Sequence, residues 1–304
     1  MFKYHILALL LGTILDFVFG KIYSIWNPFD SIRGFVKYLD RALLGDEIIL
    51  LEPSKQKSLG IWLIAIVILP VFAVITFFTM LCYDIAIPVG VLFEAFATYL
   101  CVDCKYLLTG AISVMNEFYS DGIDAMKNAY QLIFSKESME NDEAKVTEEV
   151  ITYVANEASD AVISPLVVMF LFGPVGGFIY RTIDIIDGEI GYRNSRYNHF
   201  GCPAATLFRI VDYIPGKVSG ALSVFCARHI TCDLDGRNGK YINLRDRYKA
   251  VSAFAGALQI QLKEGTVGDA DRIPKASDIR RAVRLTRHVF ILIQVILVIL
   301  LLIF

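Results

Sequence analysis

The stretch that decides the fold is Ile163–Tyr180, ISPLVVMFLFGPVGGFIY, followed at once by RTIDIIDGEIGYRNSRYNHFGCPAATLFRIVDYIPGKVSG over residues 181–220. The first segment is apolar enough for a bilayer, but Pro165 and the run from Gly173 to Gly177 interrupt it. The second segment places carboxylates and bases beside the membrane. Backbone that leaves the regular helix survives at membrane depth only where protein or a water-filled cavity covers it. We therefore expect a binding or reaction site at this junction.

The composition is that of a membrane protein. The 304 residues are 56% hydrophobic with a mean hydropathy of +0.55, which is too apolar for an ordinary soluble domain. Leu59–Leu81 carries no charge and predicts a membrane-spanning helix, and Tyr4–Phe19, Ile85–Cys101 and His288–Phe304 are further candidates. The sequence therefore predicts an all-α, polytopic integral membrane protein with about four spans plus re-entrant or interfacial helices.

Two segments predict helices that do not simply cross the bilayer. Between residues 21 and 50, apolar side chains recur at helical spacing opposite Arg33, Lys37 and Arg41, which favours an interfacial helix. Thr206–Ile230 mixes apolar and charged residues around Pro215, so a broken interfacial or partly re-entrant helix is expected there.

The charge distribution predicts the orientation. Four arginines between residues 280 and 287 precede the last apolar run, and basic residues flanking a span mark the cytoplasmic side. We expect a multi-pass protein of the cell membrane with its site on the cytoplasmic face and its last helix running outward. If residues 103–161 and 181–205 are both cytoplasmic, residues 162–180 must dip into the membrane and return. One kinked span is the alternative that the sequence leaves open.

We expect one membrane domain over residues 1–304. Its parts are the N-terminal spans with the interfacial helix (1–101), a cytoplasmic helical segment (102–161), the broken helices with the site (162–231), a second cytoplasmic segment (232–287) and the C-terminal span (288–304). The six cysteines are dispersed, which favours buried thiols over a disulfide framework.

The polar part of the decisive stretch also resembles a known family. Phe178–Asn194, FIYRTIDIIDGEIGYRN, followed by YNHFGCPAA and DYIPGKVSG, is similar to the signature of the CobD/CbiB membrane proteins of cobalamin biosynthesis. Those proteins are adenosylcobinamide-phosphate synthases. The resemblance implies a carbon–nitrogen ligase that joins a carboxylate of adenosylcobyric acid to the amine of aminopropanol phosphate or ethanolamine phosphate.

The same resemblance implies the ligands and partners. ATP and Mg²⁺ are the implied cofactors, and a corrinoid and an amino-alcohol phosphate are the implied substrates. The lipid bilayer and other membrane-bound cobalamin enzymes are the implied partners. No nucleic acid is expected, and no P-loop is present in the sequence.

Acidic residues are the expected catalytic and metal-binding groups. Asp184 and Asp187 are three residues apart, so a helix places both carboxylates on one face, where they are expected to bind magnesium together with Asp160 or Glu189. The alternative is that Asp187-Gly188 simply ends a helix at the membrane surface. Asp184, Asp187 and Asp160 are the expected catalytic residues.

The expected substrate-binding residues are Arg193, Asn194, Tyr192, Lys217 and Asp16. Arg193 and Lys217 are suited to phosphate, whereas the alternative is that these bases anchor anionic lipids. Tyr192 and Asn194 match the family pattern.

Two acids lie inside apolar runs, where an ionisable group is costly and faces protein or a cavity. For Asp16 we expect a part in the site, which the family pattern supports. For Glu94 we expect a buried polar contact.

The chain also departs from the family pattern. Thr152 stands where a glutamate is usual, Asn156-Glu157 inverts a Glu-Asn pair, and Phe208-Arg209 replaces an Asp-Asp pair. The last change reverses the local charge, so a metal could not bind there unaltered. These departures leave open a second hypothesis, a catalytically altered or inactive relative that binds corrinoid or scaffolds the membrane-bound enzymes of the pathway.

Overall fold

The computed structural model describes residues 2–22, 26–45, 52–192, 196–231, 234, 249–263, 267–268 and 272–303. These residues form helices and connecting segments, and the only β pairing among them is an isolated bridge between Leu262 and Val267. The prediction of an all-α protein is therefore confirmed.

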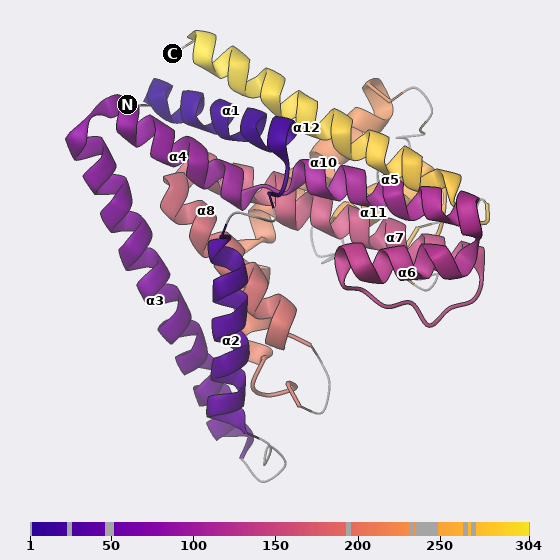
Figure 1. Ribbon diagram of the computed structural model, residues 1–304, viewed down its shortest axis with the longest axis horizontal. Coiled ribbons are helices and arrows are strands. Elements are labelled where there is room, and N and C mark those ends of the chain that lie inside the picture. The colour runs from indigo at the N-terminus through magenta and orange to yellow at the C-terminus, as the bar shows by residue number, and fades with distance from the viewer. Residues whose placement is uncertain are drawn as a thin grey trace. The chain divides into compact units, whose positions relative to one another are not determined.

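The chain forms two compact units. Met1–Leu15, Ile22–Val102 and Pro165–Tyr213 make the first, whereas Asp16–Lys21, Asp103–Ser164 and Ile214–Phe304 make the second. Figure 1 labels the helices in chain order. They are α1 (Phe2–Phe19), α2 (Pro28–Leu44), α3 (Pro53–Ile85), α4 (Ile87–Cys101), α5 (Cys104–Asp121), α6 (Ile123–Phe134), α7 (Glu143–Glu157), the π-helical segment η2 (Ala158–Ile163), α8 (Ser164–Ile190), α9 (Cys202–Val211), α10 (Tyr213–His229), α11 (Lys249–Leu258) and α12 (Ser277–Ile303).

Five helical stretches among the described residues are long and apolar enough to cross a membrane. They are Phe2–Phe19, Pro53–Ile85, Ile87–Asp121, Glu143–Ile190 and Ser277–Ile303, and the broken pair α9–α10 makes a sixth if it forms one span. The predicted spans Tyr4–Phe19 and Leu59–Leu81 fall wholly within these stretches. Nearly all of Ile85–Cys101 and the described part of His288–Phe304 do so too. The interrupted segment lies in the fourth stretch, Glu143–Ile190. The third stretch, Ile87–Asp121, includes α5, which was expected in the cytoplasm.

A core of apolar side chains holds α2, α3, α8 and α9 together in the first unit. The expected interfacial helix is α2, whose buried face includes Val36 and Leu39. Figure 1 shows α2 beside α3. On the polar side of α2, Arg33 and Lys37 lie 3.3 and 3.5 Å from the carboxylate of Glu189 on α8.

The interruption predicted in α8 is a break at Gly173. Its φ of 67° and ψ of −165° are not helical and lie where only glycine is unstrained. Pro174 follows and has no N–H, so the carbonyl of Phe170, four residues earlier, loses its helical donor. The ring of His5 on α1 lies with Nε2 3.2 Å from this oxygen, so the imidazole replaces the missing donor.

A carboxylate holds that imidazole in place. Nδ1 of His5 is hydrogen-bonded to Glu94 Oε1 on α4, and the hydroxyl of Tyr83 on α3 donates to Glu94 Oε2 at 2.6 Å. The side chain of Glu94 is 3% exposed. The buried polar contact expected for Glu94 is thus confirmed, and it supports the backbone at the helix break.

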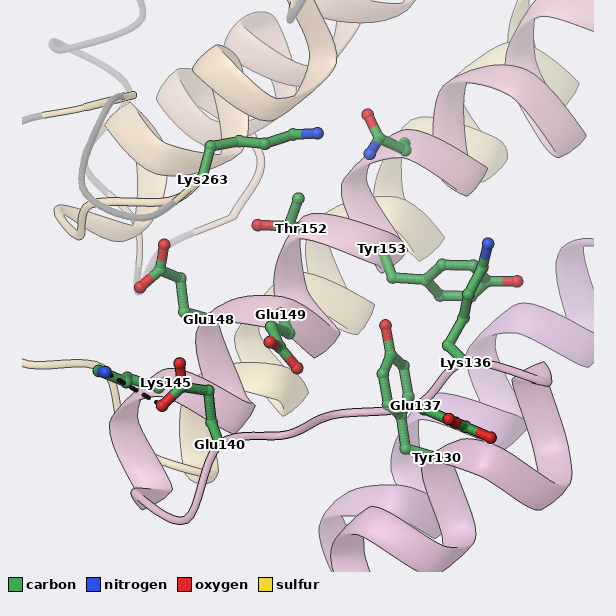
Figure 2. A pocket seen from close by; sticks show the side chains of 11 residues that line it. Tyr130, Lys136, Glu137, Glu140, Lys145, Glu148, Glu149, Thr152, Tyr153 and Lys263 are labelled. Atoms are coloured by element: carbon green, nitrogen blue, oxygen red, sulfur yellow. Dashed lines mark hydrogen bonds and ion pairs between the residues drawn. The ribbon is translucent and has the colours of Figure 1, made fainter. Parts of the chain in front are cut away.

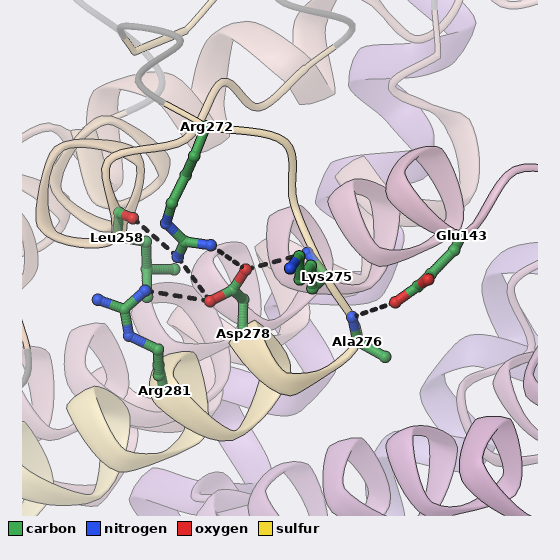
Figure 3. A network of polar contacts seen from close by, with 7 residues as sticks. All are labelled: Glu143, Leu258, Arg272, Lys275, Ala276, Asp278 and Arg281. Carbon is green, nitrogen blue, oxygen red and sulfur yellow. Dashed lines mark hydrogen bonds and ion pairs between the residues drawn. The ribbon is translucent and has the colours of Figure 1, made fainter.

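A second polar network fixes the start of α12 in the second unit (Figure 3). Asp278, 2% exposed, accepts bonds from both terminal nitrogens of Arg272 at 2.7 and 2.6 Å and from Arg281 at 3.1 Å. Arg272 also donates to the carbonyl of Leu258 at the end of α11, and the N–H of Ala276 donates to Glu143 at the start of α7. The buried carboxylate of Asp278 therefore ties the start of α12 to the end of α11 through Arg272, and the carboxylate of Glu143 joins the same segment to the start of α7.

Candidate functional site

The predicted site residues fall in both units. Asp184, Asp187 and Tyr192 belong to the first, and Asp16, Asp160 and Lys217 belong to the second. Arg193 and Asn194 lie outside the described residues. The groups are described below one unit at a time.

The two carboxylates predicted to bind magnesium lie near the end of α8, half-buried. Arg181, one turn before Asp184, donates to its Oδ2 at 2.8 Å and is itself 8% exposed. Asp187 lies within electrostatic range of Asp184 and of Arg209 on α9. The two carboxylates therefore share a face, as their spacing predicts, and each has a guanidinium partner nearby.

The other charged groups around the end of α8 are already engaged. Glu189, considered as a third magnesium ligand, faces Arg33 and Lys37 instead. Arg196 donates to Asp40 at 3.2 Å, and the hydroxyl of Tyr197 donates to the same oxygen at 2.9 Å. Burial and the bond to Asp40 raise the pKa of Tyr197, so this hydroxyl remains a donor.

A cavity of about 180 Å³ is lined by residues just after α8 and by residues of α9. Its walls are Gly191, Tyr192, Tyr197, Asn198, Cys202, Ala205, Thr206 and Arg209. Arg209 lines the cavity and lies within electrostatic range of Asp187, and a guanidinium on a cavity wall is suited to bind an anion. No group of three or more His, Cys, Asp or Glu side chains among the described residues is arranged to hold a metal ion. Two carboxylates suffice for magnesium when phosphates supply further ligands.

In the second unit, Asp16 serves the backbone. It is 1% exposed, and its Oδ2 accepts the N–H of Lys105 in the first turn of α5 at 3.1 Å. The ammonium of Lys105 donates in turn to the carbonyl of Val18 at 2.6 Å. A carboxylate at a helix N-terminus satisfies an unpaired donor and complements the helix dipole. Asp16 therefore holds the end of α1 against the start of α5 and is closed to a dissolved ligand.

Asp160 lies on the π-helical segment η2, half-buried, directly after α7. Such single turns of π-helix are rare and are frequent at functional sites. The carbonyl of Ala161 beside it accepts the N–H of Asp103 at 3.1 Å. Lys217 is half-buried on α10.

Sequence reasoning missed a larger cavity of about 660 Å³ on α6 and α7 (Figure 2). Its walls are Tyr130, Lys136, Glu137, Glu140, Lys145, Glu148, Glu149, Thr152, Tyr153, Asn156 and Lys263. The available signal was Thr152 and Asn156, both noted as departures from the family pattern. They are four residues apart and therefore share a helix face.

The comparisons with known proteins agree on a family. The model of the family described as "CobD/Cbib protein" matches residues 9–286. The chain is similar to the "Cobalamin biosynthesis protein CobD" of Clostridium perfringens, 24% identical with 90% of each chain covered, and to that of Pelobacter propionicus, 25% identical with 84% of this chain and 79% of the relative covered.

A further relative is the "Probable cobalamin biosynthesis protein CobD" of Methanococcus aeolicus, 27% identical over 73% of this chain and 71% of its own. No solved structure matches the chain. The family model covers nearly the whole sequence, including both cavities and every predicted site residue. The chain therefore belongs to the CobD/CbiB family of cobalamin biosynthesis proteins.

Proposed function

We propose that this chain is an adenosylcobinamide-phosphate synthase. It would use ATP to join the carboxylate of adenosylcobyric acid to the amine of aminopropanol phosphate or ethanolamine phosphate. The observation that carries the proposal is the family match over residues 9–286. The cavity on α6–α7, lined by charged side chains, and the cavity beside α8, with Arg209 on its wall, support it.

The chemistry requires activation, because a carboxylate is a poor electrophile. Transfer of the γ-phosphoryl group of ATP to a carboxylate oxygen gives an acyl phosphate and ADP. The amine then attacks the carbonyl carbon, the amide bond forms, inorganic phosphate leaves and the amine loses a proton. The protein must hold two sets of phosphates and exclude water from the acyl phosphate.

The groups at the end of α8 fit the nucleotide. Asp184 and Asp187 are the carboxylates that would hold Mg²⁺. A bound Mg²⁺ would neutralise part of the negative charge of the ATP phosphates. Arg209, on the wall of the cavity of about 180 Å³ and within electrostatic range of Asp187, would grip a phosphate group. Arg193, outside the described residues, and Lys217, in the second unit, are proposed as substrate-phosphate partners by their charge alone. Arg181 orients Asp184.

The test is turnover by the purified protein. Given adenosylcobyric acid, MgATP and either amino-alcohol phosphate, we expect release of ADP together with the amide. Asp187→Asn should lower kcat by about 100-fold or more, because it removes a carboxylate from the phosphoryl-transfer site. Glu189→Gln is the matched control, since that carboxylate pairs with Arg33 and Lys37, and it should stay near wild type. An unchanged kcat in Asp187→Asn would show that the nucleotide does not bind at the end of α8.

A second candidate, a non-catalytic relative, is favoured by one observation. The guanidinium groups of Arg181 and Arg209 accompany Asp184 and Asp187, and Arg209 stands where the family pattern has a carboxylate. Such a protein would bind corrinoid or scaffold neighbouring enzymes. Binding of adenosylcobyric acid without ADP release, with either amine phosphate present, would identify it.

We also propose that the polar segments face the cytoplasm and that α12 runs outward, because four arginines between residues 280 and 287 lie in its first turns. Alkaline phosphatase, active only outside the cytoplasm, should be active when fused after Phe304 and inactive when fused after Asn141. The reverse pattern would invert the topology.

A further inference from the structure

The cavity on α6 and α7 combines both signs of charge. Four glutamates and three lysines are among its walls (Figure 2). Lys145 and Glu140 form an ion pair at 3.0 Å, and Glu148 and Lys263 also have partners. At about 660 Å³ the cavity lies within the usual range for small-molecule sites.

Two polar atoms on its α7 wall have no partner. Oε2 of Glu149 and Oγ1 of Thr152 are buried and make no hydrogen bond with the rest of the described chain. They are three residues apart on α7, so they project from one face. A buried carboxylate oxygen without a donor is costly, and a ligand that supplies donors relieves that cost.

The positive charge of Lys136 lies near two aromatic rings. Lys136 lies with Nζ 6.0 Å from the centre of the Tyr153 ring, which meets the Tyr130 ring edge to face. Burial, followed by the charge of Glu149, raises the pKa of Tyr130, so its hydroxyl stays protonated and can donate. Figure 2 shows Glu149 and Thr152 on α7 between this aromatic end and the Lys145–Glu140 pair.

These features exclude simple ligands of one charge. A free phosphate or nucleotide would face four carboxylates, one of them already unpaired, and a simple cation would face three ammonium groups. A small molecule with an ammonium at one end and a phosphate at the other satisfies both. We propose that this cavity binds the amino-alcohol phosphate, with the ammonium on Glu149 and Thr152 and the phosphate toward Lys136 and the Tyr130 hydroxyl.

The identity of this ligand rests on the proposed function, but its binding can be measured without turnover. Calorimetric titration of the full-length protein in nanodiscs, without ATP or corrinoid, would use ethanolamine phosphate, aminopropanol phosphate, ethanolamine and inorganic phosphate as separate probes. We expect both amine phosphates to bind and each single-charge probe to bind about 100-fold more weakly, since half of the contacts are lost.

Glu149→Gln is the decisive variant. It should weaken amine phosphate binding about tenfold or more, whereas Glu117→Gln, on an exposed position of α5 outside the cavity walls, should change it less than about twofold. The Glu149→Gln protein should also melt at about the same temperature as wild type, because the two side chains are alike in size and Oε2 of Glu149 has no hydrogen bond to lose. This shows that any loss of binding is not a loss of folding.

The outcomes separate the two proposals. If the protein binds amine phosphate only when Glu149 is present but shows no ligase turnover, the proposed binding site is supported and the proposed synthase activity is rejected. If Glu149→Gln turns over with an unchanged KM for the amine phosphate, the proposed synthase activity stands and the proposed binding site is rejected. Tighter binding of inorganic phosphate or of ethanolamine than of either amine phosphate, or no amine phosphate binding at millimolar concentration, also rejects the proposal for this cavity.

Discussion

Glu94→Ala should destabilise the protein by about 3–5 kcal/mol, the cost of removing one partner of a buried charged pair. The variant leaves His5 without its carboxylate and Tyr83 without its acceptor. His5 then no longer holds the carbonyl of Phe170, which Pro174 has deprived of a helical donor. Equilibrium unfolding in mixed micelles measures the change.

A double variant separates the buried charge from the lost bonds. His5→Leu with Glu94→Leu removes both polar groups, so it should recover part of the stability lost in Glu94→Ala while the carbonyl of Phe170 stays without its donor. Equal stability of Glu94→Ala and wild type would show that the network does not support the break in α8.

Asp278→Ala should cost about 3 kcal/mol, because it removes a buried carboxylate that accepts charge-assisted hydrogen bonds from the half-buried side chains of Arg272 and Arg281. The loss should be cooperative, since the same carboxylate also accepts the N–H of Lys275 and fixes the chain that joins α11 to α12. Glu140→Ala, in an exposed pair with Lys145, is the control and should cost less than about 1 kcal/mol. If both variants unfold alike, the network in Figure 3 is not a structural centre.

Features set by local pattern were predictable from the sequence. The uncharged run Leu59–Leu81 lies inside α3, and the amphipathic pattern after Trp26 forms α2. The Gly-Pro pair predicted the break that occurs at Gly173. Each of these depends on side chains within a few turns, which composition and spacing report directly.

Features that depend on distant contacts were not predictable. His5 and Glu94 are 89 residues apart, and so are Asp16 and Lys105, whose N–H donates to Asp16. No local sequence pattern connects the members of either pair. The large cavity was missed because part of its wall comes from residues 135–140, which the sequence showed only as a polar segment. One neighbour could have been foreseen: Arg181 stands three residues before Asp184, on the same helix face.

The central claim is that this protein activates a carboxylate with ATP, and the oxygen atoms of that carboxylate give the most direct test. Adenosylcobyric acid labelled with ¹⁸O in its free carboxylate would be turned over with MgATP and an amino-alcohol phosphate. Formation of an acyl phosphate predicts one labelled oxygen in the inorganic phosphate released and the other in the amide. Amide formed with unlabelled phosphate, or no amide at all in the presence of every substrate, would contradict it.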